Sequence, residues 1–255
     1  MSTTQHPPVA VLWRDERGAV VCKPSGMLSH NSTFAGPPEY ALLQAARDTL
    51  GARIWLVNRL DRGTSGCLLV CFAADDVAPW VAAQQAGRKA YLAVVRGRLR
   101  APVLIDKALR DEQGVEREAR THITPLAVSE LARISLVRCA LEHGRNHQAR
   151  RHLNRASHPV VNDSNHGDTR FNGAFREVWG VSRLLLHAER LEMRHPFSGQ
   201  PLRVDCLVPE AMSALIAQLL PTWDPTQAIG ADAVDGRSNQ PGATQAGPAA
   251  PETSG

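Results

Sequence analysis

The 255-residue sequence lacks several features that would mark a membrane or disulfide-rich protein. No apolar run approaches the ~20 residues that a membrane-spanning helix requires. The start, MSTTQHPPVA, has neither a basic leader nor an apolar stretch, so we expect no secretory signal. The five cysteines are odd in number and form no CxxC pair, which argues against a disulfide framework or a four-cysteine zinc site. We therefore expect a cytoplasmic protein with reduced thiols.

Charge is unevenly placed along the chain. The formal net charge is +4, but residues 224–255 contain four acidic residues and one basic residue, which leaves +7 on the first 223 residues. A basic body suits a polyanionic partner such as RNA. The segment 224–255 has almost no large apolar residue, so it is predicted to be a disordered acidic tail. Residues 1–8 are predicted to be a flexible N-terminus, and residues 9–223 one folded domain.

The order of apolar runs and turn signals predicts an α+β fold rather than a doubly wound parallel sheet. The run at 67–72 (CLLVCF) is continuously apolar, so that strand should be covered on both faces. The charged segment 110–122 is interpreted as a surface excursion. The other expected strands are 19–22, 91–96, 131–141, 190–194 and 202–208, and the expected helices are 40–50, 75–88, 145–157 and 210–220.

One motif places an aspartate between two arginines. Asp61, with Arg59 and Arg62 beside it, lies in the run NRLDRGTSG at residues 58–66, just before the buried strand. Nearby guanidinium groups should keep the carboxylate ionised, as a nucleophile or general base requires. The alternative is a surface ion pair beside a turn.

A second candidate is Tyr91, one of two tyrosines, at the start of a predicted strand. A tyrosine there can stack on a nucleobase and offer its hydroxyl to a moving proton. The alternative is a packing residue.

The most basic segment lies at residues 143–155 (HGRNHQARRHLNR), with four arginines and no acid from Arg145 to Arg155. At 100° per residue, one helical face carries His147, Arg150, Arg151, Asn154 and Arg155. Such a stripe can bind phosphates, although a solvated basic face would look the same. Arg145 precedes the helix and could turn inward to pair with Asp61.

A metal site is a competing interpretation of the histidines. His143 and His147 are four residues apart, and Asp163, His166 and Asp168 follow. Gly144 interrupts helical continuity between the two histidines, however, and the arginines would repel a dication. We therefore expect no metal ion.

Taken together, the motifs resemble the RNA pseudouridine synthase family typified by ribosomal large subunit pseudouridine synthase A. The runs that carry the resemblance are VCKPSG at 21–26, RLDRGTSG at 59–66, KAY at 89–91, GRNHQAR at 144–150, HP at 158–159, LLHA at 185–188 and HP at 195–196. The runs RRHL at 150–153, DSNHGDTRFN at 163–172 and HPFSG at 195–199 are most similar to the tRNA pseudouridine synthase C subgroup, which modifies uridine 65 of tRNA. Two departures are Asn58, where the family usually has histidine, and Asn162, where it usually has glycine. Asparagine tolerates left-handed backbone geometry, so Asn162 can preserve a turn.

The resemblance implies a pseudouridine synthase fold, with a mixed, mainly antiparallel sheet, flanking helices and a central catalytic cleft in domain 9–223. It implies that Asp61 is the essential carboxylate, acting either as a nucleophile on the sugar or by promoting loss of a ribose proton. Tyr91 would stack on the uracil, and Arg145 would pair with Asp61. The expected RNA contacts are Arg59, Arg62, His147, Arg150, Arg151 and Arg155.

The resemblance also implies no cofactor, and a monomer is expected. The expected substrate is tRNA, and large-subunit ribosomal RNA is the alternative. A non-catalytic RNA-binding protein on the same scaffold is a further alternative, for which Asn58 is the only motivation.

Overall fold

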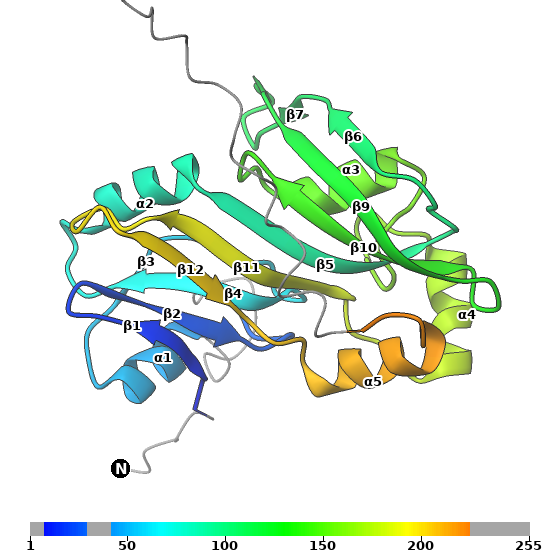
Figure 1. Cartoon of the computed structure of the whole chain (residues 1–255), viewed down its shortest axis with the longest axis horizontal. Coiled ribbons are helices and arrows are strands. Elements are labelled where there is room, and N and C mark those ends of the chain that lie inside the picture. Colours follow the sequence, from blue (N-terminus) through cyan, green and yellow to red (C-terminus); the bar gives the residue numbers. More distant parts are fainter. Residues whose placement is uncertain (1–7, 30–41, 225–255) are drawn as a thin grey trace, which may run out of the picture. The chain divides into compact units, whose positions relative to one another are not determined.

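The computed structural model describes residues 8–29 and 42–224. Their strands build one long sheet and a separate short hairpin, with helices packed around the sheet (Figure 1). The helices are α1 (Leu42–Leu50), α2 (Val77–Ala86), α3 (Gln148–Arg155), α4 (Thr169–Trp179) and α5 (Glu210–Leu219). The strands are β1 (Val11–Arg14), β2 (Gly18–Lys23), β3 (Trp55–Leu56), β4 (Ser65–Cys71), β5 (Arg88–Arg96), β6 (Val103–Asp106), β7 (Leu109–Arg110), β8 (Glu116–Arg117), β9 (Arg120–Ser129), β10 (Ile134–Leu141), β11 (Leu186–Arg194) and β12 (Pro201–Asp205).

The sheet follows the order β1-β2-β4-β11-β5-β10-β9-β6, with β12 paired to β11 and β3 to β4. Among the described strands only β4 and β11 run parallel, and they pair only through His187 with Ser65 and Ala188 with Gly66. The rest of that side of β11 pairs with β12 instead. The two strands therefore separate beyond a short contact at the centre of the sheet. The predicted α+β fold with a mixed, mainly antiparallel sheet is confirmed.

Strand β4 contains most of the apolar run at residues 67–72 and is buried on both faces. All its residues are buried. Leu68 and Val70 pack in the cluster that contains α1, while Leu69 packs in the cluster that contains Trp80 of α2. Since successive strand residues point to opposite faces, helices cover both faces of this part of the sheet. The prediction of a strand covered on both sides is confirmed.

The other half of the sheet is built in the same way around β5. Leu92 and Val94 pack with residues of α4 and α5, whereas Ala93 and Val95 pack with residues of α3. This alternation fixes α3 against one face of the sheet, so the N-terminus of α3 has a defined position relative to β5.

The segment 110–122 is more structured than a surface excursion. Strands β7 and β8 form a hairpin, because the Asp111 carboxylate accepts hydrogen bonds from the backbone N–H groups of Gln113 and Val115 and from Arg117 Nε. Strand β9 then begins at Arg120. Local polar capping, which produces no apolar periodicity, explains why the sequence pattern missed this hairpin.

Helix α4 was also absent from the prediction, although its ends carry recognisable signals. The Asp168 carboxylate caps the first turn by accepting from the Phe171 N–H at 2.9 Å, and Gly180 ends the helix with a left-handed φ of 67°. The predicted flexible N-terminus, the start of the predicted helix at residue 40 and nearly all of the predicted tail fall outside the described residues. Within the described residues, no helix is long and apolar enough to cross a membrane.

Gly66 controls the close contact of β4 with β11, so we predict that Gly66→Ala is strongly destabilising. Its φ is +115°, and an added Cβ would lie 2.2 Å from the Ala188 carbonyl oxygen. Backbone strain plus this collision should lower the free energy of unfolding by about 3 kcal/mol or more. Gly114→Ala is the matched control, since Gly114 also has positive φ but an added Cβ would meet nothing within 4 Å. Urea denaturation should show a loss of about 1 kcal/mol in the free energy of unfolding for the control. Equal losses in the two variants would contradict the predicted collision of a side chain at Gly66 with β11.

Candidate active site

The loop that carries Asp61 is fastened to the turn after β2. The backbone N–H of Gly26 donates to the Arg62 carbonyl at 2.8 Å, and the Ser25 hydroxyl donates to the Gly63 carbonyl at 2.7 Å. Farther along, the Ser29 hydroxyl donates to the Leu60 carbonyl, also at 2.7 Å. The runs KPSG and RLDRG are therefore one structural unit, although they lie far apart in the sequence.

Lys23 is the buried centre of that unit. Its side chain is fully buried, and Nζ donates to the carbonyls of Met27 at 2.6 Å, Pro24 at 2.9 Å and Arg62 at 3.1 Å. Burial lowers the pKa of Lys23 to about 7, and the nearby carboxylate of Asp61 opposes that shift. Lys23 was not predicted to be a site residue; the signal that could have found it is its place at the end of an otherwise apolar strand.

Asp61 is held by Arg150. Arg150 Nη1 donates to Asp61 Oδ2 at 2.8 Å, while Nε and Nη2 of the same guanidinium bind both oxygens of Asp163 at 2.8 and 2.7 Å. Arg150 is 6% exposed and Asp163 is 2% exposed, so this pair lies largely out of water, whereas Asp61 is partly exposed to the cleft. Burial opposes charge on both partners, yet their hydrogen bonds prevail, raising the pKa of Arg150 and lowering that of Asp163.

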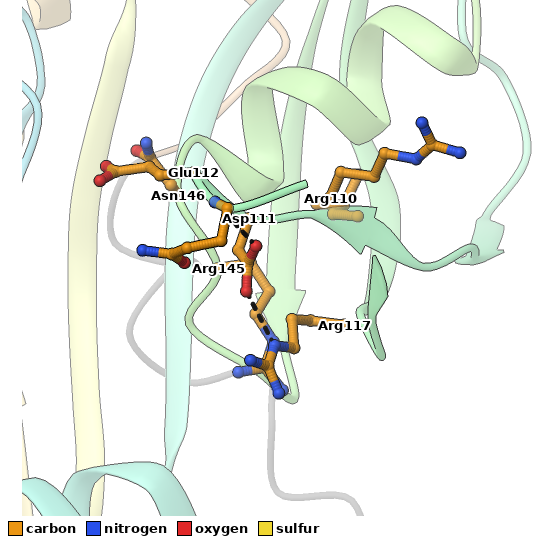
Figure 2. Close-up of a pocket in the computed structure, with 8 residues that line it drawn as sticks. Arg110, Asp111, Glu112, Arg117, Arg145 and Asn146 are labelled. Carbon is orange, nitrogen blue, oxygen red and sulfur yellow. Dashed lines mark hydrogen bonds and ion pairs between the residues drawn. The ribbon is translucent and has the colours of Figure 1, made fainter. Parts of the chain in front are cut away.

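The expectation that Arg145 pairs with Asp61 is wrong. Arg145 lies before α3, and its exposed side chain points to β-hairpin β7–β8, where Nε donates to the Glu118 carbonyl at 2.9 Å. Its backbone N–H is fixed by the Gln148 side chain at 3.1 Å. Arg145 lines a pocket of about 180 Å³ together with the hairpin (Figure 2). The residue that reaches Asp61 is instead Arg150, which was predicted to contact RNA from the basic face of α3.

The helical-face prediction for residues 147–155 is therefore only partly correct. Ala149 and Leu153 pack inward, on the side of α3 away from most of the basic stripe. Arg150, however, follows Ala149 by only 100° and sits at the border of the inward face, where a partner such as Asp163 can draw it in. A paired aspartate at 163 was visible in the sequence, but its contact with Arg150 depends on the loop before α4, which no local pattern predicts.

The remaining predicted RNA-binding residues separate into two groups. Arg59 and His147 line the main cleft, as does Arg62, whose Nε donates to the Gly26 carbonyl at 3.1 Å. Arg151 and Arg155 are not among the described residues that line it. Each donates to a backbone carbonyl near the β7–β8 hairpin, Arg151 to Arg110 and Arg155 to Ala108, both at 3.0 Å. These two arginines thus brace the hairpin against α3.

The main cleft has a volume of about 1270 Å³ and contains Asp61, Tyr91 and Arg150 in its lining. Tyr91 extends from β5 with its ring packed between two core clusters. Burial raises the pKa of its hydroxyl, and the Asp61 carboxylate adds to the shift. Tyr91 therefore lines the cleft as a neutral phenol.

The two departures from the family pattern have structural explanations. Asn58 Oδ1 accepts the Leu69 N–H at 2.9 Å, so this side chain secures the loop to β4 without any need to titrate. Asn162 has a φ of 63°, and its Nδ2 donates to the Val181 and Arg183 carbonyls. The left-handed turn that we expected at Asn162 is present.

The histidines and acids considered as a metal site are not gathered into one cluster. Among the described residues, no group of three or more histidine, cysteine or acidic side chains could hold a metal ion. His143 lies 3.8 Å from Glu118, whereas His147 lies 3.5 Å from Asp61 and hydrogen-bonds to His166.

Comparison with known proteins assigns this arrangement to a family. A model described as RNA pseudouridylate synthase matches residues 18–155, which include Lys23, Asp61, Tyr91 and Arg150. The chain belongs to the RNA pseudouridylate synthase family. The family predicted from the motifs is thereby confirmed.

Members of this family with similar sequences include two bacterial proteins named tRNA pseudouridine synthase C. The protein from Yersinia pestis is 34% identical over 82% of this chain and 90% of its own length. The protein from Pectobacterium carotovorum is 36% identical over 75% of this chain but only 57% of its own length. Among solved structures, human RNA pseudouridylate synthase domain containing 1 matches with a TM-score of 0.67 at 22% identity, covering 88% of this chain and 90% of that chain. This likeness supports the fold.

The Lys23 contacts predict that Lys23→Met lowers the free energy of unfolding, because the carbonyls of Pro24 and Met27 lose their donor and the Arg62 carbonyl keeps only the Gly26 N–H. Each unsatisfied buried group costs about 1–3 kcal/mol, so we expect a loss of at least about 2 kcal/mol, against little change for the exposed control Lys107→Met. The folded pKa of about 7 lies below that of an unfolded lysine, so the unfolded state binds more protons above pH 7. The difference in free energy of unfolding between the wild type and Lys23→Met should therefore grow, in favour of the wild type, as pH rises from 7 toward 10. Denaturation at several pH values measures this gain, and a constant difference would contradict it.

Proposed function

We propose that this protein is an RNA pseudouridine synthase that converts a specific uridine to pseudouridine, with tRNA as its substrate and Asp61 as its reactive carboxylate. The observation that carries the proposal is the Asp61 carboxylate, which lies in a large cleft beside Tyr91 and is bound by a buried guanidinium. Membership of the family supports the same reaction.

The reaction breaks the bond between uracil N1 and ribose C1′ and forms a bond from C5 to C1′. The C5 hydrogen is lost as a proton and N1 gains one, so no oxidation or reduction takes place. Asp61 starts the reaction either by adding to C1′ or by promoting loss of a ribose proton, and both routes begin from the ionised carboxylate. Arg150 balances that charge through Oδ2, which leaves Oδ1 as the less occupied oxygen facing the cleft.

The target base has to leave its stack to reach Asp61, which costs a few kcal/mol that contacts elsewhere must offset. Tyr91 offers a ring for the displaced uracil, because its position on β5 is fixed by packing on both sides. The exposed guanidinium groups of Arg59, Arg62 and Arg145 surround the cleft and suit phosphate contacts. Arg145 thus changes from the expected partner of Asp61 to a proposed contact with the RNA backbone.

The names of the similar bacterial proteins support tRNA as the substrate class, and the resemblance of residues 163–172 supports uridine 65 as the target. We place the enzyme in the cytoplasm as a monomer that acts without a cofactor. The isomerisation is redox-neutral and starts from the Asp61 carboxylate, so the reaction as written uses no cofactor.

Tritium release from RNA labelled at uridine C5 tests the proposal, because isomerisation must expel the C5 hydrogen. We expect release from an unmodified tRNA transcript and none for Asp61→Asn, which keeps the shape of the side chain but removes its charge. A tRNA with uridine 65 replaced by cytidine should also give none. Release from large-subunit ribosomal RNA alone would contradict tRNA as the substrate. RNA binding without release from either RNA would contradict the proposal that the protein is an enzyme.

Arg145→Ala should weaken RNA binding more than it slows turnover, because Arg145 makes no contact with Asp61 in this structure. Loss of one phosphate contact should reduce the slope of log affinity against log salt by about 1 unit and leave kcat within about threefold of wild type. Filter binding over a salt series, combined with saturating kinetics, measures both quantities. A large fall in kcat with unchanged affinity would restore Arg145 to the catalytic group.

A further inference from the structure

His147 and His166 form a hydrogen-bonded pair next to Asp61. His147 Nε2 lies 3.5 Å from Asp61 Oδ1, and its Nδ1 lies 2.9 Å from His166 Nε2. The two rings meet edge to face with centroids 5.1 Å apart. His147 itself has a left-handed φ of 52°, at the residue that precedes the first turn of α3. That backbone geometry turns its ring toward the cleft rather than along the helix.

The spacing of the two rings determines where the protons lie. One hydrogen bridges two ring nitrogens at 2.9 Å, so one nitrogen donates and the other accepts. If His166 Nε2–H donates, Nδ1 of His147 is the acceptor, and a neutral His147 carries its proton on Nε2, facing Asp61. The opposite arrangement would direct a lone pair of His147 at the carboxylate, which is electrostatically unfavourable.

His166 is itself held by the acid that holds Arg150. The backbone N–H of His166 donates to Asp163 Oδ1 at 3.0 Å, and the same oxygen accepts from Arg150 Nη2. Asp163 is therefore linked to Asp61 by two chains of contacts. One passes through Arg150 to Oδ2, and the other passes through His166 and His147 to Oδ1.

We propose that His147 and His166 are a positioning pair, in which His166 selects the Nε2–H tautomer of His147 and this N–H orients Oδ1 of Asp61 for reaction. The inference rests on the proposed function, since Asp61 is the reactive carboxylate. His166 thereby acts on the reaction only through His147. The oxygen whose orientation the pair sets is Asp61 Oδ1, to which Arg150 does not bind.

The charged groups around the pair set its response to pH. Asp61 comes from the β3–β4 loop, Arg150 and Arg151 come from α3, and Asp163 comes from the loop before α4. Burial lowers the pKa of both histidines, and the arginines add to the shift while the aspartates oppose it. Protonation of His147 at Nδ1 would remove the acceptor of the hydrogen bond from His166 Nε2–H. Without the hydrogen bond from His166, the neutral form of His147 is less stabilised, so its pKa should rise.

Nitrogen-15 NMR of the histidine rings, which reports the tautomer directly, is the first readout because it needs no activity. In the wild type, His147 should be the Nε2–H tautomer. In His166→Phe it should become a mixture of the two tautomers, whereas His166→Gln, whose amide nitrogen can donate from a similar position, should restore Nε2–H. His122→Phe is the matched control, because His122 is a half-exposed histidine that pairs with Glu142 and is not among the described residues that line the cleft. An unchanged His147 tautomer in His166→Phe would overturn the proposal.

Kinetics provide the second readout. With saturating RNA, His166→Phe should lower kcat about tenfold with KM little changed, and the acid limb of the kcat profile should move to higher pH. His166→Gln should return kcat to within about threefold of wild type and return the acid limb of the kcat profile to its wild-type pH. Equal kcat and an unmoved limb in His166→Phe would overturn the positioning role. Absence of tritium release from the wild type would instead refute the proposed function, and the NMR result would still be readable.

Discussion

Arg150 places one guanidinium between two carboxylates that come from different parts of the chain, Asp61 from the β3–β4 loop and Asp163 from the loop before α4. Removing these charges from water is costly, and the cost is offset only when the hydrogen-bond geometry is good on both sides. Here Asp163 binds two nitrogens of the guanidinium and leaves Nη1 for Asp61. Asp163 thereby decides the direction in which Arg150 points, and Asp61 receives a rigid partner rather than a mobile surface arginine.

The sheet positions the loop that carries Asp61. Strands β4 and β11 pair only around Gly66 and Ala188, and glycine is required there because a side chain at Gly66 would collide with β11. The loop before β4 is then tied to the turn after β2 through Lys23, whose buried Nζ satisfies three backbone carbonyls. Asp61 therefore stands on a loop whose backbone groups are paired, although loops are usually the more mobile parts of a domain. The order of this loop is set by buried polar contacts.

The sequence was informative where the signal was local. The continuous apolar run of β4 predicted a strand covered on both faces, and the structure has one. Asn162 was predicted to keep a left-handed turn because asparagine tolerates that geometry, and it does so. The motifs also indicated the family, since their residue types and order are specific.

The partner of Asp61 was not predictable in the same way. Arg145 and Arg150 lie five residues apart in one basic segment, and either could reach inward from the sequence alone. The choice depends on where α3 begins, on the left-handed backbone of His147 and on a carboxylate thirteen residues beyond Arg150. These are tertiary constraints. The β7–β8 hairpin was missed for a related reason, since it is held by the Asp111 carboxylate and by arginines of α3 rather than by an apolar face.

The most direct test of the account compares Arg150→Lys with Arg145→Lys in single-turnover isomerisation of tRNA at saturating enzyme. Both changes keep the positive charge, but lysine cannot bind Asp163 through two nitrogens and reach Asp61 with a third. The account predicts that Arg150→Lys slows the chemical step about a hundredfold or more, as misplacement of a reactive group does, while Arg145→Lys stays near wild type. A slow step in Arg145→Lys together with a normal one in Arg150→Lys would contradict the assignment of Arg150 as the residue that holds Asp61.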